Sequence, residues 1–292
     1  MASGKALALL FLLLWSPLSR AEAPLQIVAS FSILADLAQQ VGQERVEVTA
    51  LVPAGRNLHQ FQPKPADAKL LAHADLVLIN GLGTEGWLDQ LVRASGFKGR
   101  ILQLGQTAHL RRTADGAIDP HSWQEIANVR AAVAAIAESL AALRPDQAES
   151  FRAQAARYDQ TLAALDAWVR QEIGWIPAER RVLVVPHDAF GYFADAYQLR
   201  ILPLQGASGD TEPTARRFAE LSKAVRGGQI TALFGEINED NRPIKQLAKE
   251  SGGALAGELY ADSLSPAGGP ADSYERLMRH NVGMMVQAME SK

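Results

Sequence analysis

Four residues of types that bind divalent metals stand at similar places in the chain. His59, His121, His187 and Asp262 each follow an expected strand, directly or through a short loop. In open parallel sheets, ligands bind beyond the carboxyl ends of the strands. Two of the four residues lie in each half of the chain, so facing halves would bring all four together. Three imidazoles and one carboxylate form a tetrahedral nitrogen and oxygen shell that suits Zn²⁺. The spacing therefore predicts a metal site.

The other three histidines do not share this pattern. His73 and His280 fall inside expected helices, where we predict surface or boundary side chains. His109 lies alone in a loop, and we expect it to be solvated, with a secondary ligand role as the alternative. The chain has no cysteine, so a metal must bind through histidine, carboxylate or backbone oxygen.

Two acidic residues are candidates for supporting the metal-binding imidazoles. Such rings usually donate their second N–H to a carboxylate or a carbonyl. Glu236 follows an expected strand, and Asp119 comes two residues before His121. We expect three aromatic side chains near these positions to belong to the core: Trp87, Trp123 and Phe190.

The segments that must position these residues alternate between strand and helix patterns. Strands are expected at residues 25–30, 46–52, 75–80 and 100–104, and again at 181–186, 200–204, 230–234 and 254–259. Helix-like segments separate them, and such alternation implies right-handed crossovers and parallel sheets. The expected fold class is α/β, with two (βα)4-like domains joined by a long rigid α-helix.

The long helix is expected at residues 144–173. Pro145 suits its first turn, and Gly174 and Pro177 end it. One apolar stripe at spacings of three and four runs along it: Phe151, Ala155, Tyr158, Leu162, Leu165, Val169 and Ile173. A rod of roughly 40 Å would result. The alternative is a long helix packed on one domain. The expected division is 1–21 signal peptide, 22–143 N-terminal domain, 144–176 linking helix and 177–292 C-terminal domain.

The first residues have the pattern of a secretory signal peptide. Lys5 precedes an apolar run at 6–15, and small residues follow at Ser19, Ala21 and Ala23. Cleavage is expected after Ala21, which would leave an exported, soluble protein. Without a cysteine there is no residue for a lipid anchor. The net charge of −3 and the lack of a basic run argue against a nucleic-acid partner.

Five motifs add a resemblance to a known family. They are GRNLHQFQPKPAD, NGLGTEGWLDQL, DPHSWQEIANV, HDAFGYFADAY and LYADSL. In this order they resemble the motifs of the zinc- and manganese-binding substrate-binding proteins of bacterial ABC transporters. The resemblance implies two βα domains joined by a long helix, with one metal between them. It also implies four ligands at the matching positions: His59, His121, His187 and Asp262.

The resemblance implies a receptor that is not an enzyme and delivers a metal to an ABC permease in the inner membrane. Manganese receptors of the family tend to have a carboxylate at the position of His187, so a histidine there favours zinc as the transported ion. The His-rich loop frequent in the zinc branch is missing before DPHSW, and Leu58 replaces a usual proline. A monomer is expected, and a periplasmic metallochaperone is a candidate partner.

Three alternatives stay open at this point. The first is a manganese or iron receptor of the same family. The second is an exported zinc metallohydrolase, although four protein ligands would leave no position for the catalytic water. The third is a receptor for an organic metal chelate, which converging free imidazoles fit less well than a bare ion does.

Overall fold

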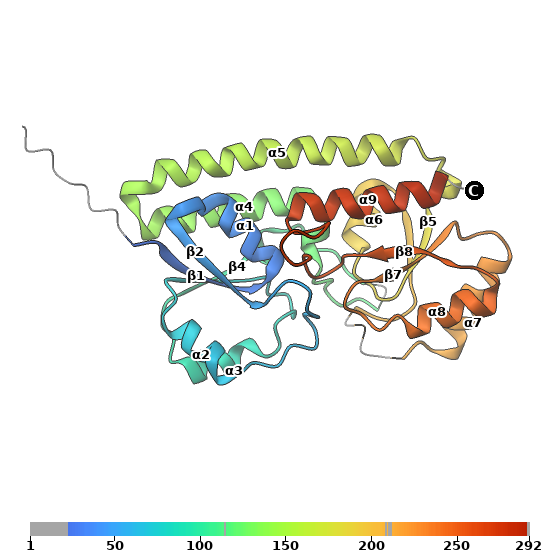
Figure 1. Ribbon diagram of the computed structural model, residues 1–292, viewed down its shortest axis with the longest axis horizontal. Helices are drawn as coiled ribbons and strands as arrows, with labels where there is room; N and C mark the ends of the chain where they lie inside the picture. Colours follow the sequence, from blue (N-terminus) through green and yellow to red (C-terminus); the bar gives the residue numbers. More distant parts are fainter. Residues whose placement is uncertain (1–22, 114, 208, 210–211, 291–292) are drawn as a thin grey trace, which may run out of the picture.

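The protein forms two α/β lobes that lie side by side beneath one long helix, α5 (Ala148–Gly174) (Figure 1). The structure is a computed structural model, and it describes residues 23–113, 115–207, 209 and 212–290. The expected signal peptide at 1–21 and its cleavage site lie outside these residues, so both stay predictions.

The N-terminal lobe is built on a parallel sheet with the strand order β2-β1-β3-β4. Its strands are β1 (Leu25–Phe31), β2 (Val46–Val52), β3 (Leu76–Ile79) and β4 (Arg100–Gln103). Its helices are α1 (Ser32–Gly42), α2 (Pro65–Ala72), α3 (Leu88–Ser95) and α4 (Ile126–Leu143), with 3-10 turns at Gln43–Arg45, Leu104–Thr107 and Ser122–Gln124. All four residues of β3 are buried, because helices cover both faces of the sheet.

The C-terminal lobe repeats this arrangement with the strand order β6-β5-β7-β8. Its strands are β5 (Val182–Val185), β6 (Arg200–Pro203), β7 (Ala232–Glu236) and β8 (Leu255–Leu259). Its helices are α6 (Gly191–Tyr197), α7 (Ala215–Arg226), α8 (Arg242–Ser251) and α9 (Tyr274–Glu290), and 3-10 turns at Pro145–Gln147 and Ala178–Arg180 flank α5. Neighbouring strands in both sheets pair in parallel. The predicted fold class is confirmed.

Turns precede two of the helices that follow candidate ligands. After His121 comes the 3-10 turn Ser122–Gln124, and α4 begins at Ile126. In the second lobe α6 begins at Gly191. The preceding backbone is tied into a turn, because Asp188 N–H donates to Gly206 O at 3.3 Å and Ala189 N–H to His187 O at 3.0 Å.

The stripe predicted for the long helix is the face that α5 buries. Its seven members are the seven buried residues of α5. This face packs on α1 and α4 of the first lobe and on α6 and α9 of the second. One continuous apolar core therefore runs beneath α5 through both lobes. The alternative, in which the helix packs on one domain alone, does not hold.

Helix α4 has the length and apolar composition of a membrane-crossing segment. In the structure 56% of that segment is buried, and it packs against α5 and α1. This is the pattern of a core helix. The division of the chain at 143/144 and 176/177 stays a proposal. It is supported by the position of α5 between the last strand of one sheet and the first strand of the other.

The shared core gives a first testable prediction. Leu162 lies in the middle of the α5 stripe with none of its surface exposed. Leu162→Ala should reduce the free energy of unfolding by about 2–5 kcal/mol, because it leaves a cavity in a packed core. The measurement is denaturant unfolding. Gln160→Ala, at an exposed position of the same helix, is the matched control, and an equal loss in both variants would contradict the assignment.

Candidate metal centre

The four predicted ligands come from four separate loops and meet between the lobes. His59 lies in the loop between β2 and α2, and His121 directly precedes the turn Ser122–Gln124. His187 comes two residues after β5, and Asp262 three residues after β8. One ligand atom of each lies within 4.8 Å of the others. Within the described ranges no other such group of three or more histidine and acidic side chains occurs.

The carboxylate of Asp262 stands at the centre of this group. Its Oδ2 lies 3.1 Å from Nε2 of His59 and 3.3 Å from Nε2 of His187. Its Oδ1 lies 3.9 Å from Nε2 of His121. These five atoms are buried, and none makes a hydrogen bond of normal geometry. Buried polar atoms are rarely left in this state, so the arrangement fits a cation bound among them.

Carboxylates outside the group fix two of the imidazole rings. His121 Nδ1 lies 2.9 Å from Oδ1 of Asp119, and His187 Nδ1 lies 2.6 Å from Oε2 of Glu236. The same carboxyl groups accept the backbone N–H of His121 and His187 at 3.0 and 3.2 Å. With Nδ1 occupied in this way, Nε2 of each ring is left to face the centre. Both acidic residues lie where the sequence pattern placed them.

The order of strands explains why Glu236 reaches His187. Strands β5 and β7 are neighbours in the second sheet, and the chain leaves β5 in one direction and β7 in the other. His187 follows β5, and Glu236 is the last residue of β7. Side chains at such a switch point converge beyond the carboxyl ends of the strands.

The corresponding point of the first sheet holds a polar network in place of a ligand. The buried carboxylate of Glu85 accepts hydrogen bonds from Ser30 Oγ at 2.7 Å and from the backbone N–H of Asn80 at 2.8 Å. The amide of Asn80 donates to Pro120 O at 2.8 Å and accepts from Ser122 Oγ at 3.1 Å. This network holds the segment that carries His121. The sequence analysis gave Asn80 and Glu85 no role, although both lie in the NGLGTEGW motif.

A second network supports Asp119 from across the lobes. Arg111 Nη1 lies 2.9 Å from Oδ2 of Asp119, and its Nε lies 2.8 Å from Asp195 of the second lobe. Tyr192 of α6 donates its hydroxyl to Asp119 O at 3.2 Å and accepts from Arg111 N–H at 3.0 Å. Burial acts to raise the pKa of Asp119, but His121 and Arg111 outweigh it and lower that pKa. The sequence analysis missed Arg111 and Tyr192, because nothing in the spacing links them.

The group is strongly coupled electrostatically. Burial acts to lower the pKa of His187, but Glu236 and Asp262 raise it well above its usual value. Burial also acts to lower the pKa of His59, but the nearby carboxylate of Asp262 outweighs it and raises that pKa. The pKa of Asp262 falls well below its usual range, because His187 and His59 outweigh the effect of burial. Protons would therefore compete with a metal for the rings of His59 and His187.

The remaining candidates lie away from this centre. His73 is exposed, and His280 packs beside Tyr260 with ring centroids 5.2 Å apart. The His109 side chain is 65% exposed and pairs with Glu125 at 2.9 Å. The aromatic residues expected in the core are buried in two cases and partly buried in the third: Trp123, Phe190 and Trp87. The ring of Trp123 also lies 5.3 Å from that of His121.

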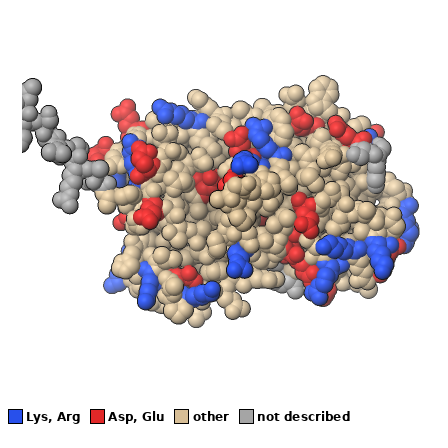
Figure 2. Space-filling model, in the orientation of Figure 1, with Lys and Arg blue, Asp and Glu red and all other residues tan. Residues whose placement is uncertain are grey.

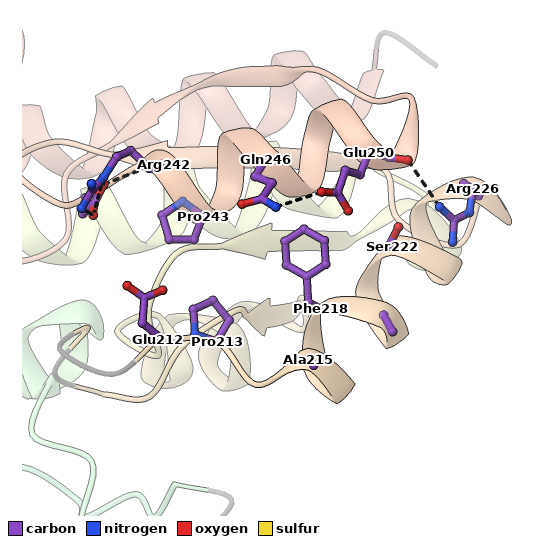
Figure 3. Close-up of a pocket in the computed structure, with 12 residues that line it drawn as sticks. Glu212, Pro213, Ala215, Phe218, Ser222, Arg226, Arg242, Pro243, Gln246 and Glu250 are labelled. Atoms are coloured by element: carbon purple, nitrogen blue, oxygen red, sulfur yellow. Dashed lines mark hydrogen bonds and ion pairs between the residues drawn. The ribbon is translucent and has the colours of Figure 1, made fainter.

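A groove of about 760 Å³ between α7 and α8 is a separate feature (Figure 3). Phe218 points into it, and Pro213 and Pro243 lie at one end (Figure 3). Two of its arginines have partners: Arg242 pairs with Asp240, and Arg226 Nη1 lies 3.4 Å from Glu250 O. None of the four metal-binding candidates lines it.

The comparison with protein families decides what kind of protein carries this centre. Residues 27–288 match the family described as ZnuA, zinc-uptake complex component A, periplasmic. The chain belongs to this family. Its members are metal-binding substrate-binding proteins of ABC transporters and not enzymes, so the metallohydrolase alternative falls away.

Relatives across most of the chain bind different metals according to their names. A manganese-binding lipoprotein MntA of Halalkalibacterium halodurans is 32% identical over 91% of this chain and 88% of its own length. The iron-binding protein YfeA of Yersinia pestis is 29% identical over 88% of this chain and 84% of its own. The periplasmic zinc-binding protein TroA of Treponema pallidum has a solved structure with a TM-score of 0.86 and 30% identity, covering 92% of this chain and 99% of that one. The chain is therefore a metal receptor of an ABC importer, with a membrane permease as its partner.

Glu236 provides a test of how the imidazoles are held. Glu236→Gln keeps the size of the side chain and removes the charge beside His187. Metal affinity should fall by about 10–100-fold, as for other carboxylates that orient a metal-binding imidazole. The measurement is competition titration with a chelator. Asp89→Asn, an exposed acid on α3, is the control for loss of one negative charge, and equal affinities in both variants would contradict the role of Glu236.

The raised pKa values of His59 and His187 set the pH dependence. As pH falls, both rings bind protons more fully and compete with the metal, so affinity should weaken. Between about pH 7.5 and about pH 5.5 we expect a loss of about 10–100-fold in affinity. Titration calorimetry in buffers of different ionisation enthalpy would also count the protons released. If the affinity stayed constant over this range while circular dichroism showed a folded protein, protons would not compete with the metal at these histidines.

Proposed function

We propose that the chain is a high-affinity zinc receptor that uses His59, His121, His187 and Asp262 as the metal ligands. The observation that carries the proposal is the donor set, in which three imidazole Nε2 atoms face one carboxylate. Imidazole suits Zn²⁺, whereas Mn²⁺ favours carboxylate, carbonyl and water. Four protein donors that approach one point from separate loops also suit the tetrahedral preference of zinc.

Manganese is the second candidate, with iron as a further member of the same group. The observation that favours manganese is the name of the Halalkalibacterium halodurans relative, a manganese-binding lipoprotein. Against it stands His187, which supplies nitrogen where an oxygen ligand would suit the harder ion. Selectivity between these ions is a matter of geometry and ligand type, and competition in solution measures it directly.

The proposal places the receptor in the periplasm after removal of residues 1–21. It would act as a monomer, take zinc directly or from a metallochaperone, and pass it to the permease in the inner membrane. The 292 residues contain no cysteine to which a thioether-linked lipid could be attached. Over the described residues on the face in Figure 2, Lys and Arg are mixed with Asp and Glu, and no continuous basic surface suggests nucleic acid.

The test is metal analysis of the purified protein, followed by competition between Zn²⁺ and Mn²⁺. We expect about one zinc ion per chain, and zinc should displace manganese at equal concentrations. His121→Ala should lower zinc affinity by more than about 100-fold, because it removes a ligand as well as its oriented ring.

His73→Ala is the matched control, because His73 is exposed and outside the site. It should bind zinc like the unchanged protein. Retention of manganese in the presence of equal zinc would replace the zinc assignment with the manganese one. Undiminished affinity of His121→Ala for both ions would overturn the ligand set.

A further inference from the structure

One hydrogen bond joins the loop that carries His59 to a loop of the other lobe near the candidate metal centre. Asn57 Nδ2, in the loop before His59, donates to Glu239 Oε1 at 2.6 Å. The same amide lies 3.4 Å from Asn238 O. Asn57 belongs to the first lobe, and Asn238 and Glu239 to the loop that follows β7 in the second. The contact is partly buried, so it forms at the border between the centre and solvent.

Asn57 also shapes the loop that presents His59. Its Oδ1 accepts the backbone N–H of Gln60 at 2.9 Å. This bond from a side chain to a backbone N–H restrains the local backbone. One amide group therefore uses its oxygen to hold the His59 loop in shape and its nitrogen to fasten that loop to the other lobe. A movement that carries Asn57 and His59 together away from the second lobe would break the bond to Glu239.

Glu239 is connected to the other histidine in a similar way. Its backbone N–H donates to Glu236 O at 3.4 Å, and the side chain of Glu236 holds His187. The second oxygen of Glu239 lies over the loop that contains Gly209. A Cβ atom on Gly209 would stand 3.3 Å from Glu239 Oε2 and 3.6 Å from His187 Cβ. Glu239 is therefore packed close to His187 without belonging to the four-residue ligand group.

Several other contacts between the lobes are more deeply buried. Trp123 Nε1 and Gln124 Nε2 both donate to Ala261 O, at 2.9 and 2.7 Å, and both bonds are buried. In the His59 loop, Gly55 N–H donates to Leu264 O and to Ser263 Oγ, both at 2.9 Å. Breaking these would leave buried polar groups without partners, which is unfavourable. The contact of Asn57 with Glu239 is at the solvent edge, where water can replace either partner.

We propose that the Asn57–Glu239 hydrogen bond is a latch that sets how slowly the metal leaves the centre. Resting on the proposed metal-receptor function, the inference adds two positioning residues to it. When the latch is closed, the His59 loop is held against the second lobe and the ligand cannot swing out. When it opens, the segment from Asn57 to His59 loses this tie, while Gly55 N–H keeps the start of the loop on Leu264 O and Ser263 Oγ. The lobes themselves need not separate.

The test uses stopped-flow release of zinc from the full mature chain into excess chelator. Asn57→Asp keeps the acceptor for Gln60 N–H and places a second carboxylate against Glu239. Glu239→Ala removes the acceptor of the latch. Each should speed zinc release by about tenfold, the ratio expected for loss of one hydrogen bond. Association rates and melting temperatures should stay close to those of the unchanged protein.

Glu239→Gln is the matched control, because its amide oxygen can still accept from Asn57 while its charge is gone. Its release rate should stay within about threefold of the unchanged protein, since most of the contact is retained. The double variant Asn57→Asp with Glu239→Ala should release zinc no faster than either single variant, as for two partners of one contact.

The outcomes separate the latch from the proposed function. Release rates of Asn57→Asp and Glu239→Ala equal to that of the unchanged protein would overturn the latch and leave the receptor intact. A Glu239→Gln variant as fast as Glu239→Ala would also overturn it, because charge and not the hydrogen bond would then be responsible. An unchanged protein that binds neither Zn²⁺ nor Mn²⁺ would overturn both inferences together.

Discussion

The buried carboxylate of Asp262 is the constraint on which the rest of the structure depends. It faces three imidazole nitrogens supplied by loops of both lobes, at distances from 3.1 to 3.9 Å. A carboxylate buried without partners would be strongly unfavourable. The histidines must therefore be held at this point whether or not a metal is present. Asp119 and Glu236 do so for two of the rings, and the latch with Asn57 does so for the loop of the third.

The four loops can converge only if the two lobes keep a fixed separation. The apolar core that both lobes share maintains it. Both lobes share one apolar cluster beneath α5, while separate smaller clusters lie under α2 and α3 and under α7 and α8. The side of the molecule along α5 is thus the rigid side (Figure 1). The loops with the candidate ligands follow the carboxyl ends of strands that this core holds in place. Local movement of a loop is then less costly than rotation of a lobe.

The sequence predicted the parts of this structure that follow from local pattern. The α5 stripe was predicted from apolar residues at spacings of three and four, and the parallel sheets from the alternation of strand and helix patterns. The convergence of His59, His121, His187 and Asp262 was predicted from their shared place after strands. Arg111, Tyr192 and the Asn57–Glu239 contact could not be predicted, because they depend on how two lobes face each other. The transport role was predicted from the family resemblance, because the spacing of the four candidate ligands indicates a metal site but not what the protein does with the metal.

The raised pKa values at His59 and His187 give the centre the properties of an ion exchanger. Because these shifts favour the charged imidazoles, protons on the rings can offset the negative charge of Asp262 when no metal is present. A divalent cation bound at the four candidate ligands would take over this role. The buried carboxylate would then have a positive partner in both states, which limits the cost of its burial.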